Sequence, residues 1–379
     1  MSGAATGLRA FSDLKVLEAC GPFGAYAGKL LGDLGSTVTR LVSTSSPDPV
    51  AAVGKASKDG VGSFYRFVNI GKQTALAPAA ESDLHHWIDQ HLVGTDLVIA
   101  DPNVTGDPLA SLLLERAVEA QVGTIVEIRG YADGRQDRAP LDDLTAQASG
   151  GLMILTGDPE REPLRLPGYQ SYFIVGVHAA CAAVLGLLRG ASVPGQQRLR
   201  ISVHEAIVHT LETAIQYYTT AGVVRQRKGG AQQAGDGTYP TSTGMVVLGA
   251  MTDIEWGRLI DWMVGEGFED AADLRSWDLE ERRTSARRQQ FEAAFAEFVG
   301  DLPRESLIKS GQAHRVLIAP AYALSELLQD EQLLFDGFFR RVREWDGAPI
   351  VIPGPAFRST AHSLGPWSGA PAPATTESA

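Results

Sequence analysis

Short apolar stretches alternate with amphipathic ones through the first third of the chain. LKVLEA at 14–19 predicts a buried strand, FGAYAGKLLGDLG predicts a helix, and STVTRLV at 36–42 predicts a second strand. Further strands are expected at 64–78, 95–103 and 122–134, and helices at about 81–91 and 107–120. Strands that alternate with helices favour a parallel sheet covered on both faces, so we expect a doubly wound, Rossmann-like α/β domain.

Two helices rich in small residues follow. Between Leu141 and Ile154 an acidic pair opens a helix that continues through alanine, serine and glycine. A turn containing glycine and proline interrupts it, and Ser171 opens a long apolar run with glycine and alanine along it. An interior glycine costs a helix about 1 kcal/mol, so these faces indicate the close approach of another backbone or of a ligand. We therefore expect the chemistry near this helix pair.

The pattern changes beyond residue 188. An amphipathic stretch at 204–221 predicts one helix, and a polar, glycine-rich stretch at 225–237 predicts a linker before a smaller α/β domain. A tail rich in Pro, Ala, Ser and Thr closes the chain. The expected segments are a large domain over 1–205, a connecting helix and linker over 206–237, a small domain over 238–325, a return segment to the large domain over 326–365, and a disordered tail over 366–379.

Charge and cysteine content narrow the classes of protein. A formal net charge of -12 disfavours a nucleic-acid-binding surface. Cys20 and Cys181, the two cysteines, lie in apolar surroundings and predict neither a disulfide framework nor a metal site. The sequence shows no signal peptide and no run of about 18 apolar residues, so we expect a cytoplasmic protein without a membrane partner.

The stretch from 140 to 188 resembles the family III CoA-transferases, the group of formyl-CoA transferase and carnitine CoA-transferase. The resemblance rests on a Gln-Ala-x-x-Gly helix at 147–151, a Leu-Thr-Gly-Asp-Pro turn at 155–159 and a small-residue helix at 175–185, and it covers nearly the whole chain. The segment at 262–283 looks more like the benzylsuccinate CoA-transferase branch, several members of which combine two related subunits. The resemblance implies an interlocked-ring dimer and a coenzyme A thioester as substrate, with no cofactor and no metal.

Several residues match family positions that serve coenzyme A. They lie in the first helix, at strand ends and beside a Gly-Tyr-Ala turn, which in the family meets the CoA arm. Some neighbouring positions depart from the family pattern: Val42 and Ser43 replace an acid and a residue that often helps to hold CoA. The resemblance implies these CoA-binding residues: Gly24, Arg40, Lys72, Asp101, Arg129 and Tyr131.

The residue expected to carry the chemistry is replaced. The family nucleophile is an aspartate four residues before a glycine on the small-residue helix; it attacks the acyl-CoA and carries the acyl group as an anhydride. Counting back from Gly176 gives Tyr172. A phenol with a reference pKa near 10 is a poor substitute for a carboxylate and cannot form that anhydride. We therefore assign no catalytic residue to this chain.

Other titratable side chains fit ordinary roles better than that of a nucleophile or base. The racemase branch of the family places a histidine beside the residue that corresponds to Asp143, and here that neighbour is Asp142. The remaining candidates match solvated loop acids, a lone thiol and packing histidines: Asp158, Glu160, Cys20, His178 and His204.

The sequence thus predicts the non-nucleophilic subunit of a heteromeric CoA-transferase. Such an enzyme moves CoA between an acyl-CoA and a carboxylic acid, and a related partner chain supplies the aspartate. Two alternatives stay open: a homodimer with a relocated nucleophile, and a non-catalytic protein that binds acyl-CoA without turning it over.

Overall fold

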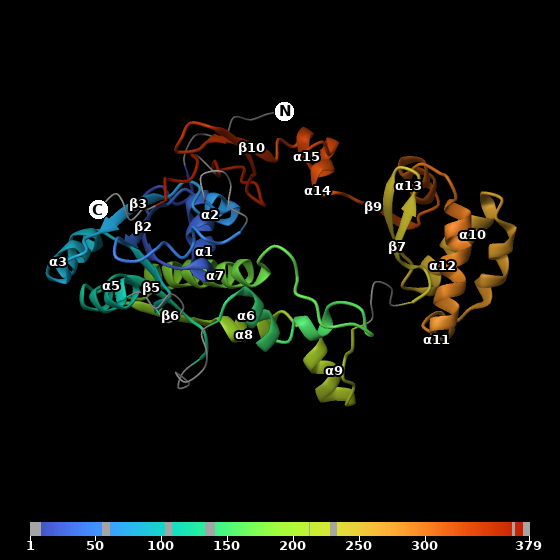
Figure 1. Cartoon of the computed structure of the whole chain (residues 1–379), viewed down its shortest axis with the longest axis horizontal. Coiled ribbons are helices and arrows are strands. Elements are labelled where there is room, and N and C mark those ends of the chain that lie inside the picture. Colours follow the sequence, from blue (N-terminus) through green and yellow to red (C-terminus); the bar gives the residue numbers. More distant parts are fainter. Residues whose placement is uncertain are drawn as a thin grey trace. The chain divides into compact units, whose positions relative to one another are not determined.

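The computed structural model describes residues 9–54, 61–102, 108–132, 141–211, 213–227, 233–365 and 368–373. The chain forms two compact units, each with a hydrophobic core of its own. Unit 1 comprises residues 1–153, 165–224 and 337–379, and unit 2 comprises residues 154–164 and 225–336 (Figure 1).

Unit 1 is built on a six-stranded parallel sheet with the strand order β3-β2-β1-β4-β5-β6. This is the order of doubly wound nucleotide-binding folds, and it reverses between β1 and β4. The predicted α/β class is confirmed. The strands are β1 (Lys15–Ala19), β2 (Thr37–Ser43), β3 (Gln73–Ala77), β4 (Leu97–Ala100), β5 (Thr124–Arg129) and β6 (Gln197–Ser202).

Helices cover both faces of this sheet. Strand residues alternate between the faces, so that Val16 belongs to the core beneath α1 and α7 while Leu17 belongs to the core beneath α3 and α5. α2 and α8 add to the first core, which is the larger. The bounds are α1 (Pro22–Asp33), α2 (Ser63–Val68), α3 (Glu81–Leu92), α5 (Pro108–Glu119), α6 (Asp143–Ser149), the 3-10 helix η1 (Met153–Leu155), α7 (Gln170–Ser192), α8 (Val203–His209) and α9 (Ala214–Ala221).

The small residues of α7 permit the close packing that the sequence predicts. A Cβ at Gly176 would lie 2.7 Å from the Cβ of Tyr26 on α1, and one at Gly186 would lie 2.5 Å from the Cγ2 of Thr124 on β5. Among the described helices, α7 alone is long and apolar enough to cross a membrane, and half of its most apolar window is buried in the unit. The contacts of α7 are those of a helix in the core of unit 1.

Two sequence expectations about elements are wrong. The stretch 64–78 is not one strand, because α2 occupies its start and the left-handed Gly71 (φ 77°) turns the chain before β3. The stretch 204–221 is not one helix, because α8 ends at His209 and α9 begins at Ala214. At the break, the hydroxyl of Thr210 donates to the carbonyl of Ile207 at 2.7 Å, a local bond typical of helix ends.

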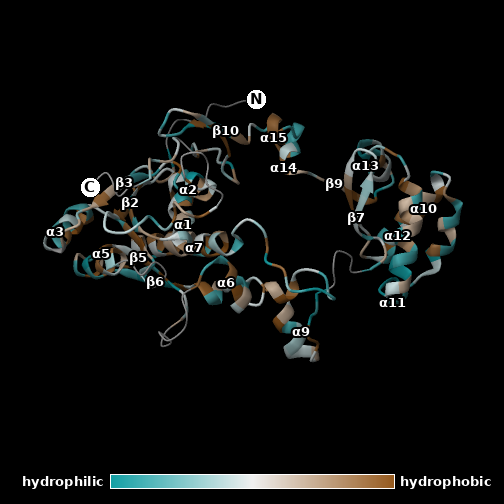
Figure 2. Cartoon of the chain, in the orientation of Figure 1, coloured by the Kyte–Doolittle hydropathy of each residue, from teal (hydrophilic) through white to brown (hydrophobic). Residues whose placement is uncertain are grey.

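Unit 2 combines a three-stranded antiparallel sheet with helices, around a core rich in tryptophan and phenylalanine. Hydrophilic residues dominate α11 in Figure 2. The elements are β7 (Asp236–Thr241), β8 (Gly244–Gly249), α10 (Asp253–Gly265), the 3-10 helix η2 (Glu269–Ser276), α11 (Leu279–Arg282), α12 (Ser285–Val299), α13 (Arg304–Ala313), β9 (Leu317–Ala321), α14 (Leu324–Leu327) and α15 (Glu331–Phe335).

The chain then re-enters unit 1 as an antiparallel hairpin of β10 (Phe339–Arg343) and β11 (Pro349–Pro353). Residues 368–373, which the composition places in a disordered tail, are packed in the structure: Ala370 is 4% exposed and belongs to the core beneath α1 and α7. We call residues 368–373 the C-terminal strap.

Candidate functional site

The carboxyl ends of β1 and β4 form the edge at which doubly wound sheets bind ligands. Asp101 directly follows β4, and both of its carboxylate oxygens accept the amide proton of Gly21 at 2.9 Å, immediately before α1. Its side chain is fully buried, and burial raises the pKa of Asp101 well above its ordinary value. Gly24, one turn into α1, lies so close to Cys20 that a Cβ would sit 2.6 Å from its Sγ. Asp101 therefore fixes the start of α1 at this edge.

A hollow opens beside this edge, between the end of β2 and the start of α5. Arg40 lies in its wall, is 3% exposed, and donates to Asp48 at 2.7 Å and to the hydroxyl of Tyr65 at 3.0 Å. Burial lowers the pKa of Arg40, but Asp48, Tyr65 and Glu18 together raise it above its ordinary value, so the guanidinium stays charged. We call this the edge hollow; its lining residues include Cys20, Arg40, Val42, Ser43, Ser46, Asp48 and Leu109.

Lys72 lies beneath the edge rather than on its surface. Its ammonium donates to Glu18 at 2.6 Å and to the carbonyl of Ala25 at 2.7 Å, and its side chain is wholly buried. Burial lowers the pKa of Lys72, and the charge of Glu18 opposes that shift. A Cβ at Gly28 would overlap the Glu18 carboxylate, so the glycine admits this ion pair beneath α1. A role for Lys72 in binding CoA stays a prediction.

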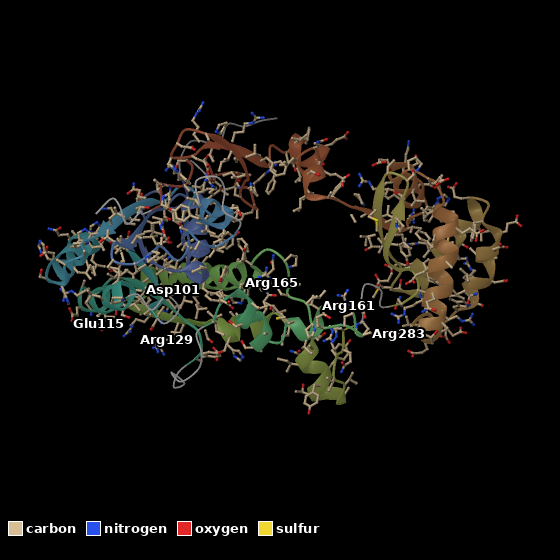
Figure 3. The ribbon with its side chains drawn as sticks, in the orientation of Figure 1. Asp101, Glu115, Arg129, Arg161, Arg165 and Arg283 are labelled. Atoms are coloured by element: carbon tan, nitrogen blue, oxygen red, sulfur yellow. The ribbon has the colours of Figure 1, made fainter. Side chains whose placement is uncertain are left out.

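Arg129 and Tyr131 are more accessible than the other predicted residues. Arg129 ends β5, its side chain is 29% exposed, and its Nε donates to Glu127 at 2.5 Å (Figure 3). Arg200 on β6 approaches the same carboxylate at 3.3 Å. The ring of Tyr131 lies 5.5 Å from that of His204. Of the six predicted CoA-binding residues, these two present partly exposed side chains to a ligand.

Tyr172 occupies the first turn of α7 as a packed, neutral side chain. Its ring meets Phe23 edge-on at a centroid distance of 4.7 Å and Phe64 at 5.4 Å, and it is 7% exposed. Its hydroxyl accepts the amide proton of Asp143 at 3.3 Å. Burial raises the pKa of Tyr172 to about 12, so no negative charge stands at this position near neutral pH.

Asp143 is the buried carboxylate of the α6–α7 junction. It accepts bonds from the hydroxyl of Ser171 at 2.6 Å, the amide of Ser171 at 3.1 Å and the side chain of Gln147 at 3.1 Å, and Arg165 lies 3.7 Å away. Gln147 also accepts the amide proton of Leu166 at 2.8 Å. This network was not among the features predicted from the sequence. The i,i+4 spacing of Asp143 and Gln147 was a signal for part of it.

The other candidates have local partners. The thiol of Cys20 donates to the carbonyl of Ile99 at 3.3 Å, and burial raises its pKa well above the ordinary value, which disfavours a thiolate. His178 bonds to the carbonyl of Ile174 and His204 to that of Ser149. Within unit 2, Asp158 accepts the amide of Glu160 at 2.8 Å. No group of three or more potential metal ligands occurs among the described residues.

Comparison with known proteins places this arrangement in a family. The family model of CoA-transferase family III matches residues 11–375. The chain is 27% identical over 361 residues to a subunit of succinyl-CoA:(R)-benzylsuccinate CoA-transferase from Thauera aromatica, covering 91% of this chain and 87% of the relative. It is 22% identical to the alpha subunit of succinyl-CoA–L-malate CoA-transferase from Chloroflexus aurantiacus, covering 87% of this chain and 78% of the relative.

The fold agrees with these matches. A CAIB/BAIF family protein from Brucella suis superposes with a TM-score of 0.81 at 20% identity, covering 96% of each chain. The predicted likeness to the benzylsuccinate branch is confirmed by the similarity to the Thauera subunit. A match over nearly the whole chain, together with the sheet edge and the α6–α7 junction described above, shows that this chain belongs to CoA-transferase family III.

Proposed function

We propose that this chain is the non-nucleophilic subunit of a heteromeric CoA-transferase, which moves CoA between an acyl-CoA and a carboxylic acid. A related chain would supply the aspartate that carries the acyl group. Support comes from the names of two similar proteins, both subunits of CoA-transferases. The proposed enzyme is a dimer, as the resemblance implies, and its two chains are related but not identical.

The observation that carries the proposal is the state of residue 172. Acyl transfer through an anhydride needs an ionised carboxylate that can reach the thioester carbonyl. Tyr172 offers a protonated phenol instead, enclosed by Phe23 and Phe64. The nearby Asp143 is no ready substitute, because its carboxylate is 3% exposed and already accepts bonds from Ser171 and Gln147, which weaken a nucleophile.

We place the nucleotide end of coenzyme A across the mouth of the edge hollow, whose enclosed volume of about 30 Å³ admits only a water-sized group. The edge hollow lies at the carboxyl ends of the strands, as ligand sites in this class of sheet do. Val42 stands where the family carries an acid, and the next residue, Ser43, ends β2 with its Oγ 2.8 Å from that of Ser45. Replacing a carboxylate by the apolar Val42 removes a repulsion from a phosphate, so this chain can hold the CoA arm while its partner performs the acyl transfer.

The experiment is a trap of the covalent intermediate. The chain is co-expressed with a related chain that carries aspartate at the position of Tyr172, the complex is incubated with succinyl-CoA, and hydroxylamine is added. Mass spectrometry of the separated chains is expected to find the hydroxamate on the partner alone. The matched control is Tyr172→Phe, which keeps the ring, cannot carry an acyl group and should leave the labelling pattern unchanged.

The competing function is a homodimer with a relocated nucleophile. A hydroxamate on any acid of this chain, or transfer by this chain purified alone, would overturn the proposal and establish that alternative. Binding of acyl-CoA without transfer in any combination of chains would instead favour a non-catalytic binding protein.

A further inference from the structure

The C-terminal strap is a packed element of unit 1. The amide of Gly71 donates to the carbonyl of Gly369 at 3.2 Å, and Ala370 is buried in the main core. A Cβ at Gly369 would overlap the carbonyl of Arg343 at the end of β10, so the close approach requires glycine. The strap is therefore held by the loop after α2 on one side and by the hairpin on the other.

Tyr65 on α2 connects the strap to the edge hollow. Its hydroxyl donates to the carbonyl of Pro371 at 3.2 Å and accepts a bond from Arg40 at 3.0 Å. Because burial raises the pKa of Tyr65 to about 12, the hydroxyl keeps its proton near neutral pH and can make both bonds. Trp345 packs edge-on against the Tyr65 ring at 6.4 Å, which limits its movement.

Arg40 connects the Tyr65 hydroxyl to the wall of the edge hollow. Its Nη2 donates to Asp48 at 2.7 Å, and the other oxygen of Asp48 accepts the amide proton of Val50 at 2.9 Å. Arg40 and Asp48 both line the edge hollow. A continuous series of hydrogen bonds thus runs from Pro371 through Tyr65, Arg40 and Asp48 to the backbone of Val50.

We infer that the C-terminal strap fixes the shape of the edge hollow through Tyr65, which makes Tyr65 a positioning residue for the nucleotide end of coenzyme A. The choice of ligand rests on the proposed function, whereas the mechanical connection does not. Loss of the strap removes the acceptor of the Tyr65 hydroxyl, so that the hydroxyl is less well fixed and its hydrogen bond with Arg40 becomes weaker. Arg40 then no longer holds the loop that contains Asp48 in one position.

Two truncations of the full chain test the connection. One variant lacks residues 368–379, and the control lacks only 374–379 and keeps the strap. Hydrogen exchange of the Val50 amide and its neighbours at 45–54 is measured without ligand. We expect exchange in the variant without the strap to be about tenfold faster, because local opening becomes easier, whereas the control matches the full chain.

Tyr65→Phe tests the positioning role without removing the strap. The ring stays and both hydrogen bonds are lost, so we expect the affinity for CoA, measured by calorimetry below the melting transition, to fall about fivefold. Tyr218→Phe, at a side chain that is 62% exposed, is the matched control and should bind as the full chain does. A lower melting temperature with unchanged CoA affinity would overturn the positioning role, since a purely structural residue behaves in that way.

The outcomes separate the two claims. Faster exchange at Val50 in the strap-less variant, together with no CoA binding by the full chain or its complex, would support the connection and overturn CoA as the ligand. Equal exchange in all three chains would overturn the connection itself.

Discussion

The sheet edge and the α6–α7 junction hold their buried polar groups in different ways. At the edge, charges occur in pairs, Lys72 with Glu18 and Arg40 with Asp48. At the junction, Asp143 is a buried carboxylate that accepts hydrogen bonds from Ser171 and Gln147, and residue 172 is a neutral phenol whose oxygen accepts a hydrogen bond from one backbone amide. A buried ion pair cannot lose one member without leaving an unpaired charge, whereas a backbone amide can donate its hydrogen bond to a phenol oxygen or to a carboxylate. The edge is therefore constrained by its own charges, whereas residue 172 is constrained by the packing of its ring and not by a requirement for charge.

Tyr172→Asp, which introduces the aspartate expected from the resemblance, should give the largest effect. The change removes a ring packed on Phe23 and Phe64 and places a carboxylate near Asp143, so we expect a loss of about 5 kcal/mol in the free energy of unfolding, measured with urea. Tyr218→Asp on the exposed face of α9 is the control and should cost less than about 1 kcal/mol. A stable Tyr172→Asp chain would show that the junction kept room for the acid.

Breaking one pair at the edge should come next. Lys72→Met leaves Glu18 buried and uncompensated, and we expect a loss of about 3 to 5 kcal/mol by the same measurement. The double variant Glu18→Gln with Lys72→Met removes both charges and should recover most of that loss. If the single and double variants lose the same stability, pairing is not what constrains the edge.

Asp101 tests whether a carboxylate at the edge costs stability near neutral pH. Burial raises the pKa of Asp101 in the folded state above its unfolded value. The loss of folding stability from burying the charged carboxylate is therefore absent at low pH and appears as the pH rises through the folded pKa. We expect Asp101→Asn, which keeps an acceptor for the Gly21 amide, to be more stable than the original chain at pH 7.5. That gain should shrink as the pH is lowered in a series of urea titrations; a constant difference would contradict the burial argument.

The smallest effect is expected for Tyr172→Phe. The ring packing stays, and only the acceptor of the Asp143 amide proton is lost, which costs about 1 kcal/mol. Thermal unfolding of the two chains under one buffer condition measures it. A loss as large as that of Tyr172→Asp would mean that the hydroxyl, and not the ring, stabilises the junction.

Local periodicity in the sequence predicted the sheet and both of its helical faces, whereas the assignment of the missing acid to position 172, by counting from Gly176, stays a prediction. Prediction from the sequence failed at the stretch 64–78, where a left-handed glycine separates a helix from a strand. It also did not foresee that Lys72 is buried against Glu18, since the two residues are 54 positions apart and meet only through the sheet. The bond from Ser171 to Asp143 follows the same rule, because the Ser171 hydroxyl reaches the carboxylate only after the intervening turn has closed.

Gly176 gives the junction a property of a different kind. Residue 172 lies one helical turn before it, and the contact of Gly176 with Tyr26 fixes the height of α7 on α1. The position of residue 172 is thus set four residues away, by a close contact of Gly176 that does not depend on the side chain at 172. Under the proposed function, a duplicated copy of such a chain can lose its carboxylate while α7 keeps its position. Two related chains can then contribute different residues to one catalytic site without a change of fold.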